Sequence, residues 1–205
     1  MVMETNGVSR SQAGSVDMES GRERVMRAAY ALFSRDGIRS VGVDTVIAEA
    51  GVAKMTLYRN FPSKEDLVLA FLRRREELWT QGWVQREMML RADTPAGRLL
   101  AVFDLFDEWF HCPDFEGCAF VTILLEVSDP RSPIRKACVQ HLENIREILA
   151  KQAVEAGIED ADAFSRQWHI LMKGAIVAAG EGDVDAAKRA KELALLLLRR
   201  HGVTA

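Results

Sequence analysis

The fold of the N-terminal third is decided by the segment Lys54-Met55-Thr56-Leu57-Tyr58-Arg59-Asn60-Phe61, which follows two short amphipathic helical patterns. Ser20-Gly21-Arg22-Glu23 has the form of a capping box, in which a serine hydroxyl accepts a hydrogen bond from a backbone N–H of the first turn. The first helix is therefore expected to begin at Gly21. It should end at Asp36-Gly37, because glycine readily adopts the left-handed conformation that closes a helix C-terminus.

A second helix and a sharp turn separate this first helix from Lys54. Asp44 is expected to cap the second helix, and the Gly51-Val52 turn leaves only a few residues before Lys54. Such a gap fits only a sharp turn between two packed helices, so the third helix should begin near Lys54. The spacing predicts a helix-turn-helix, the arrangement with which many proteins place a helix in DNA.

Helical spacing divides the third helix into a buried face and an exposed face. Leu57 and Phe61 are four residues apart, so they share one face and should anchor this helix to the first. The side chains expected to point outward are Lys54, Met55, Thr56, Arg59 and Asn60.

An exposed helix of this kind fits the major groove of B-DNA. Lys54 can donate to guanine, Met55 can press on a thymine methyl group, and Thr56 can meet a base edge or a phosphate. The side chains better suited to phosphates, which fix register without reading sequence, are Tyr58, Asn60 and Lys64, while Thr45 at the start of the second helix can do either.

These residues carry a resemblance to a known family. The run Ile47-Ala48-Glu49-Ala50-Gly51-Val52-Ala53-Lys54-Met55-Thr56-Leu57-Tyr58-Arg59-Asn60-Phe61-Pro62-Ser63-Lys64-Glu65-Asp66-Leu67 resembles the TetR (tetracycline repressor) family of bacterial transcription regulators. A looser resemblance, from Gly117-Cys118-Ala119-Phe120 through Lys173-Gly174-Ala175, is to the ligand-binding half of one branch of that family. The resemblance implies that the positions named above touch DNA. Ala53 departs from the family pattern, because a serine or threonine commonly caps the recognition helix there.

Charge is distributed as expected for a protein that meets DNA at one end. The chain carries a net charge of -3, yet residues 22–65 contain eight lysines and arginines against five acids. This segment therefore carries +3 and the remainder carries -6. A basic head on an acidic body is the pattern of a DNA-binding protein.

Composition indicates a protein that buries a full core without disulfides or metals. The chain has 205 residues, of which 48% are hydrophobic, and three cysteines, which leave an odd thiol. Residues 1–19 are polar and lack the apolar segment of a secretory signal, so we expect a flexible tail and a cytoplasmic protein. The longest apolar runs, 119–125 and 193–198, are far shorter than the ~20 residues of a membrane helix, so no membrane partner is expected.

Beyond the helix-turn-helix the pattern is helical almost throughout, which predicts an all-α fold of about nine helices. Ser63 with Asp66 should start a long helix toward Met89, and Thr94-Pro95 should cap another that reaches about Phe110. Further helices are expected near 118–127, 134–156, 161–181 and 184–200, with loops at 112–117 and 129–133. The predicted domains are a tail at 1–19, a helix-turn-helix DNA-binding domain at 20–66, and a ligand-binding and dimerisation domain at 67–205.

The last two helices suggest a homodimer. The final helix is apolar around its whole axis and must be covered on both sides. A second copy of the chain can supply that cover through a two-fold four-helix interface, although burial within one subunit is the alternative. The interface residues predicted on these two helices are Ile170, Gly174, Val177, Ala178, Leu193, Leu196 and Leu197. A two-fold dimer would read a pseudo-palindromic operator in double-stranded DNA.

Aromatic residues in the middle of the chain are candidates for a receptor pocket for a small-molecule effector. Mostly apolar walls with a few polar groups, such as His141, His169 or Cys118, can enclose a small hydrophobic ligand. The same residues also suit a packed core. The predicted ligand-binding set is Phe103, Phe106, Trp109, Phe110, Phe120, Ile123, Leu124, His141, Trp168 and Met172.

Taken with the family resemblance, the sequence predicts a sequence-specific transcriptional regulator, a repressor released from its operator by a small hydrophobic ligand. An alternative is a metal- or redox-sensing regulator that uses Cys112 and Cys118, although their spacing matches no standard zinc pattern. A general DNA-compaction protein is a further alternative. The four histidines are scattered and no glycine-rich phosphate loop is present, so neither an enzyme nor a cofactor is expected.

Overall fold

The computed structural model describes residues 19–204, and every regular element within that range is a helix. The elements are α1 (Gly21–Ser40), α2 (Val43–Ala50), α3 (Lys54–Asn60), α4 (Lys64–Arg75), η1 (Glu76–Gln85), α5 (Arg86–Arg91), α6 (Pro95–Phe110), α7 (Ala119–Glu126), α8 (Pro133–Glu155), α9 (Ala161–Gly180) and α10 (Ala186–Arg200). Since α4, η1 and α5 continue without a break, we call them together the connecting helix. Counted this way, the described range contains nine helices, and the predicted all-α fold is confirmed.

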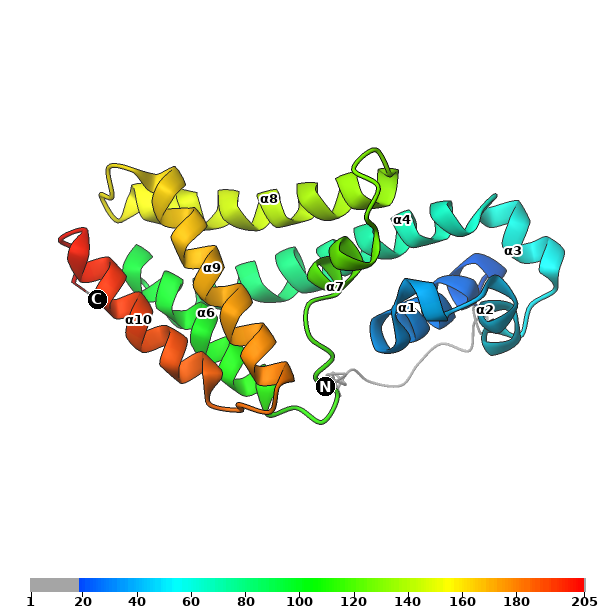
Figure 1. Cartoon of the computed structure of the whole chain (residues 1–205), viewed down its shortest axis with the longest axis horizontal. Coiled ribbons are helices and arrows are strands. Elements are labelled where there is room, and N and C mark those ends of the chain that lie inside the picture. Colours follow the sequence, from blue (N-terminus) through cyan, green and yellow to red (C-terminus); the bar gives the residue numbers. More distant parts are fainter. Residues whose placement is uncertain (1–18, 205) are drawn as a thin grey trace, which may run out of the picture.

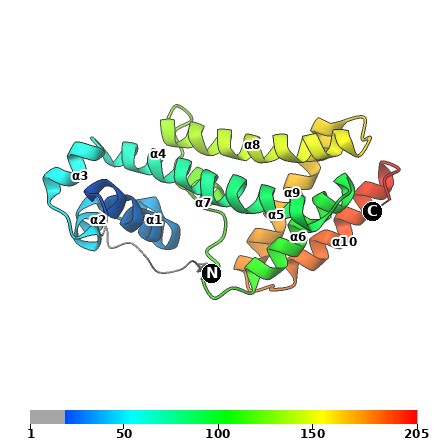
Figure 2. The same ribbon diagram turned by 180° about the vertical axis from the view of Figure 1, so that it is seen from behind.

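The molecule is elongated, with two helical groups at its ends (Figure 1). One end is the head, α1 to α3, and the other holds α6, α9 and α10. The connecting helix leads from α3 toward the far end and runs beside α8, as the view from behind also shows (Figure 2). The predicted tail lies outside the described residues except for Glu19. None of the described helices is long and apolar enough to cross a membrane.

Side-chain caps start several helices where the sequence predicts them. The Ser20 hydroxyl accepts from the Glu23 N–H at 3.2 Å, and the Ser63 hydroxyl accepts from the Asp66 N–H at 3.1 Å. Thr94 caps α6 by accepting from the Gly97 N–H at 3.1 Å. Each cap satisfies one of the backbone donors that a helix N-terminus leaves without an internal partner.

Two features at the ends of the first helices were tested by the structure. Gly37 has a φ of 74°, so the regular winding of α1 breaks there, as predicted, although the helical segment extends to Ser40. The predicted cap at Asp44 is wrong, because Gly42 occupies the N-cap position of α2 and no side chain caps it. Asp44 lies in the first turn instead, where its carboxylate is 3.6 Å from Lys54 Nζ.

The middle of the connecting helix is wound differently from its ends. Residues 76–85 form a π-helix, in which the backbone hydrogen bonds span five residues rather than four. A Cβ added at Gly82 would lie 2.8 Å from the carbonyl oxygen of Glu77, closer than such a contact allows. Glycine at this position therefore permits the wide turn. π-Helical segments are rare and often lie at functional sites.

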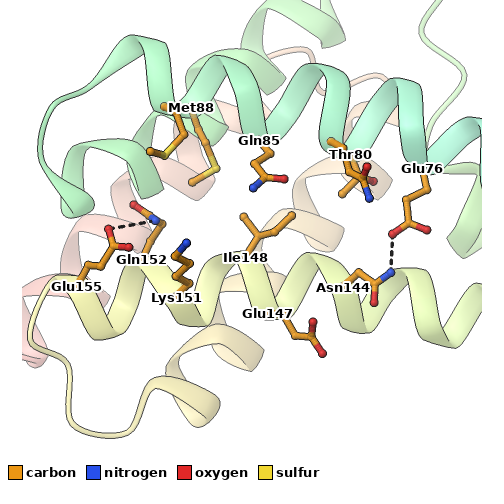
Figure 3. Close-up of a pocket in the computed structure, with 12 residues that line it drawn as sticks. Glu76, Thr80, Gln85, Met88, Asn144, Glu147, Ile148, Lys151, Gln152 and Glu155 are labelled. Atoms are coloured by element: carbon orange, nitrogen blue, oxygen red, sulfur yellow. Dashed lines mark hydrogen bonds between the residues drawn. The ribbon is translucent and has the colours of Figure 1, made fainter.

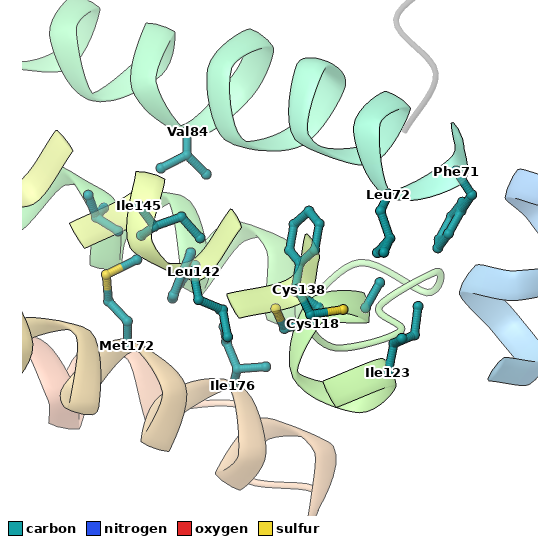
Figure 4. Packing of buried hydrophobic residues seen from close by; sticks show 14 of the residues in the cluster. Phe71, Leu72, Val84, Cys118, Ile123, Cys138, Leu142, Ile145, Met172 and Ile176 are labelled. Carbon is teal, nitrogen blue, oxygen red and sulfur yellow. The ribbon is translucent and has the colours of Figure 1, made fainter. Parts of the chain in front are cut away.

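The apolar core lies between the connecting helix, α8 and α9, and continues under α6. Figure 4 shows Val84 of the connecting helix facing Leu142 and Ile145 of α8, with Met172 and Ile176 of α9 on the opposite side. All five side chains are buried. Burial of apolar area of this kind is the main stabilising term in folding, and it fixes the platform from which the head projects.

Candidate nucleic-acid interface and ligand site

The third helix is anchored as its spacing predicts. Leu57 is 0% exposed and Phe61 is 2% exposed. On the same side, Thr56 packs so closely on the start of α1 that a Cβ at Gly21 would lie 2.6 Å from its Cγ2. Gly21 therefore lets α1 approach α3, a role that the capping-box pattern alone does not indicate.

The opposite face of α3 is open. Lys54, Tyr58 and Arg59 are exposed, and Met55 is 80% exposed, which is unusual for a methionine. The Lys54 ammonium lies 6.0 Å from the centroid of the Tyr58 ring. Thr45 on α2 is exposed as well. These five side chains, all predicted to contact DNA, are exposed on α2 and α3.

The other three predicted DNA contacts are engaged within the protein. The Asn60 side-chain amide donates to the Thr56 carbonyl at 2.8 Å, and Lys64 Nζ donates to the Ile38 carbonyl at 2.6 Å. Thr56 itself is half-buried. Contacts from these three residues to DNA stay a prediction. To bind DNA, Asn60 and Lys64 would have to give up their hydrogen bonds to the backbone carbonyls or donate to DNA as well.

Two arginines of α1 extend this basic surface and were not singled out by the sequence. The Arg22 guanidinium lies 5.1 Å from the centroid of the Phe61 ring. Arg24 Nη1 donates to the Gly51 carbonyl at 3.4 Å, beside the turn between α2 and α3. The net charge of +3 over residues 22–65 indicates a basic surface. It does not show which arginines of α1 face the third helix.

The start of α3 has no side-chain cap. Ala53 occupies the N-cap position, as predicted, and makes no cap hydrogen bond through its side chain. The first N–H groups of the helix are therefore left to solvent or to a bound anion.

The aromatic residues predicted to enclose a ligand pack on one another. The ring centroids of Phe103 and Trp168 are 5.4 Å apart, and those of Phe120 and His141 are 4.8 Å apart. Of the ten predicted residues, only Trp109 and Leu124 are half-buried and the others are buried. None of the ten lines the groove between the connecting helix and α8 or the smaller cavity between the start of α7 and α9, so their contact with a ligand stays a prediction.

The larger cavity is a groove between the connecting helix and α8 with a volume of about 400 Å³ (Figure 3). Side chains from both helices face it, and most are polar. The lining residues are Glu76, Thr80, Gln81, Gln85, Met88 and Met89 of the connecting helix, and Asn144, Glu147, Ile148, Lys151, Gln152 and Glu155 of α8. The sequence did not reveal this groove, because its lining comes from two helices far apart in the chain and contains no aromatic residue.

One end of the groove is closed by a buried polar cluster. The Glu76 carboxylate pairs with His141 Nδ1 and accepts a hydrogen bond from the Asn144 side-chain amide at 2.5 Å. Burial lowers the pKa of His141, against the opposing effect of Glu76. The contact between His141 and Glu76 ties α8 to the connecting helix.

The three cysteines differ in burial. Cys118 and Cys138 are buried in the core (Figure 4), while Cys112 is half-buried. Burial raises the pKa of Cys118 and raises that of Cys138 to about 12, which keeps both as unreactive thiols near neutral pH. Residues 19–204 contain no group of three or more His, Cys, Asp and Glu side chains placed to hold a metal.

The outer faces of α9 and α10 expose large apolar side chains. Ile170 is 63% exposed and Leu196 is 58% exposed, and Val177 and Leu193 are also more than half exposed. Gly174 is exposed among them, while Ala178 and Leu197 are half-buried. All seven residues predicted for the dimer interface thus lie at or near the surface of a single chain, and an apolar patch of this kind commonly marks a protein–protein contact.

Comparison with known proteins identifies both halves of the chain. Residues 25–71 match the family described as bacterial regulatory proteins, tetR family, and residues 95–185 match the transcriptional regulator LmrA/YxaF-like C-terminal domain. The regulator LmrA of Bacillus subtilis is 26% identical over 144 residues, which cover 69% of this chain and 76% of LmrA. The repressor KstR of Mycolicibacterium smegmatis is 39% identical over 70 residues, covering 34% of each chain.

The fold agrees with these matches. The crystal structure of a TetR-family transcriptional regulator from Streptomyces coelicolor superposes with a TM-score of 0.79 and 28% identity, covering 88% of this chain and 95% of that one. These relatives are transcriptional regulators and not enzymes. The two family matches together span most of the described residues, and the helix-turn-helix presents the exposed face that DNA binding requires. The chain therefore belongs to the TetR family of bacterial transcriptional regulators, which bind DNA through this helix-turn-helix.

Proposed function

We propose that this regulator is a repressor that binds a pseudo-palindromic operator as a homodimer and leaves it when a small molecule binds. The observation that carries the proposal is the exposed face of α3, held by Leu57 and Phe61 on the opposite side. A helix that keeps a methionine 80% exposed beside the exposed side chains of Lys54 and Arg59 suits a DNA groove better than solvent. Repression is supported by the similarity of the head to the repressor KstR.

The roles of the individual side chains follow from their freedom in the structure. Lys54 and Met55 are proposed to read base edges, because they lie at the start of α3 and point outward. Tyr58 and Arg59 are proposed to bind phosphates along the same face. The remaining proposed contacts, which fix the register of the head on DNA, are Thr45, Thr56, Asn60 and Lys64.

Dimerisation is proposed to occur through the exposed apolar face of α9 and α10. Two copies that cover each other there would remove Ile170, Val177, Leu193 and Leu196 from water, which supplies the driving force. Two-fold symmetry would set two recognition helices about 34–36 Å apart, one turn of DNA, which explains why a palindrome is expected.

Contacts at the root of the head can couple a ligand to DNA. Arg75 of the connecting helix donates hydrogen bonds to the Tyr30 and Ser34 hydroxyls of α1, at 3.1 and 3.3 Å. The backbone N–H of Arg39 donates to Glu126 of α7 at 3.2 Å. A ligand that favours one position of the connecting helix would therefore also favour one position of the head, which is the requirement for allosteric release.

The proposal is tested by fluorescence anisotropy on the DNA upstream of the chain's own coding region, against an unrelated duplex of equal length, at two salt concentrations. Sequence-specific binding should be at least about a hundredfold tighter on the upstream DNA and should weaken steeply with salt. Equal, weak binding to both duplexes would contradict sequence-specific control of this DNA and favour general compaction.

The dimer is tested by Leu196→Glu, with Leu125→Glu as the matched control. Leu125 is 80% exposed on α7, outside the proposed interface. Leu196→Glu should yield a monomer by analytical ultracentrifugation and lose operator affinity, because one head cannot hold both half-sites, whereas Leu125→Glu should leave both unchanged. A dimer that survives Leu196→Glu would place the interface elsewhere.

A further inference from the structure

The groove between the connecting helix and α8 has the size of a ligand site and a definite polar pattern. Its volume of about 400 Å³ lies within the range of small-molecule pockets, roughly 300–1,000 Å³. Carboxylates mark its two ends, with Glu76 near one and Glu155 near the other, and Ile148 lies between them (Figure 3). Met88 lies toward the Glu155 end (Figure 3), and Met89 also lines the groove.

Each end also holds a buried polar atom that has no hydrogen-bond partner. Thr80 is 1% exposed, and its hydroxyl finds no partner among residues 19–204. Gln152 is 4% exposed, and its side-chain carbonyl oxygen is likewise unpaired. Buried polar groups in proteins are nearly always hydrogen-bonded. Because Thr80 lies toward the Glu76 end and Gln152 beside Glu155, both ends of the groove offer an acceptor that a ligand can satisfy (Figure 3).

The balance of charge favours a cationic ligand. Three carboxylates line the groove, those of Glu76, Glu147 and Glu155, against the single ammonium of Lys151. Glu147 and Lys151 form no ion pair within the described part of the chain, whereas Glu155 pairs with Arg98 at 3.5 Å and Glu76 pairs with His141. Lys151 is exposed, and its side chain extends between the two helices (Figure 3). Its ammonium therefore lies where a ligand cation would compete with it.

We propose that this groove binds an elongated molecule with a protonated amine at each end and an apolar middle. One amine would donate to Thr80 Oγ1 and the Glu76 carboxylate, and the other to Gln152 Oε1 and the Glu155 carboxylate. Asn144, which binds Glu76, lies eight positions before Gln152 and eleven before Glu155 on α8, or about 12 and 16.5 Å along the helix axis, and an extended diamine with ten methylenes, roughly 14 Å long, falls between these two spans. Ile148, Met88 and Met89 would contact the methylene chain.

The binding test uses the full chain without DNA, titrated calorimetrically with 1,10-diaminodecane. Decylamine, 1,4-diaminobutane and decanedioate are the matched probes, since they remove one amine, shorten the span and reverse the charge. We expect the long diamine to bind at least about tenfold more tightly than each of the other three. Equal binding of decylamine, tighter binding of decanedioate, or no binding of the long diamine would each overturn the proposal.

Three variants separate a ligand contact from a structural role. Thr80→Val keeps the shape of the side chain and removes the unpaired hydroxyl, so it should raise the melting temperature of the free protein while it weakens diamine binding about tenfold. Lys151→Met removes the competing cation and should tighten diamine binding. Glu159→Gln, in the loop after α8, is the control and should change neither. Unchanged binding in both Thr80→Val and Lys151→Met would place the diamine outside this groove.

The inference deepens the proposed ligand response and rests on the proposed function only for its effect on DNA. Diamines also bind DNA directly, so the operator assay must compare the wild type with Thr80→Val at the same diamine concentration. Release of operator by the wild type at concentrations that leave the variant bound would assign the response to this groove. If the diamine binds the groove but the protein stays on the operator, the proposed ligand response is disproved and the diamine site stands. If the protein binds the operator specifically but does not bind the diamine, only the diamine site is disproved.

Discussion

In the head, Leu57 is fully buried and Met55, two positions earlier, is 80% exposed, so the two faces of one short helix separate anchoring from recognition. In the body, the aromatic residues that resemble a ligand pocket in the sequence, such as Phe103 and Trp168, fill the core, and the groove lies between polar stretches of two other helices. DNA recognition by an exposed helix face can be predicted from the helical spacing of residues within one segment. Ligand binding in a cavity depends on where the packed helices leave space. The sequence of a single segment does not determine that position.

The largest expected effect comes from removing the anchor of the head. Leu57→Ala should cost about 2–5 kcal/mol, because it leaves a cavity under α3, and operator binding should be lost. Leu105→Ala, at a fully buried site of α6, should cost a similar amount in chemical denaturation yet leave the folded fraction with normal operator affinity. Equal loss of operator affinity in both variants would mean that head and body do not act as separable units.

Acid should affect the body more than the head, because the body buries histidines. Burial lowers the pKa of His169 to about 3, so the folded state keeps this ring neutral while the unfolded chain protonates it below about pH 6.5. The unfolded state then binds more protons, and His169 should cost up to ~1.4 kcal/mol of stability per pH unit as the pH falls from 6.5 toward 3. Denaturation of wild type and His169→Leu at pH 7 and pH 5 should show the smaller loss in the variant. Parallel losses would contradict a buried neutral histidine.

Within the head, free and engaged cations should behave differently. Arg59 is exposed, so Arg59→Ala should weaken operator binding about tenfold and reduce the log-log salt slope by about 0.9. Lys64 already donates to the Ile38 carbonyl, so Lys64→Ala should mainly lower thermal stability. Anisotropy titrations at several salt concentrations and melting curves distinguish the two. A larger change of salt slope in Lys64→Ala would show that Lys64 leaves Ile38 to reach a phosphate.

The smallest expected effect is at the uncapped start of α3. Ala53→Ser adds a hydroxyl that can accept from a first-turn N–H, which should stabilise the free protein by up to about 1 kcal/mol. Operator affinity should change little, as measured by the same anisotropy titration. A large loss of affinity would show that DNA approaches α3 so closely that only alanine fits.

Most of the fold could be predicted from the sequence because its signals are local. Ser20, Ser63 and Thr94 cap the helices that they were expected to cap, and the φ of Gly37 breaks α1 where glycine predicts it. The predicted cap at Asp44 is wrong, because an acidic residue in the first turn of a helix looks the same in sequence as an N-cap residue. The engagement of Asn60 and Lys64 was not predictable either, since each finds a carbonyl that depends on how the helices pack. The groove depends on packing alone.

The π-helical stretch of the connecting helix has a consequence for changes in chain length. A π-helical turn contains more residues than an α-helical turn. Residues 76–85 are therefore equivalent to an α-helical segment with an inserted residue. Deleting one residue there would let the backbone return to ordinary α-winding while the faces of α4 and α5 keep their partners. A deletion within α4 or α8 would instead rotate every later side chain out of the core. The distance between the head and the groove therefore depends on the π-helical winding of the connecting helix as well as on its number of residues.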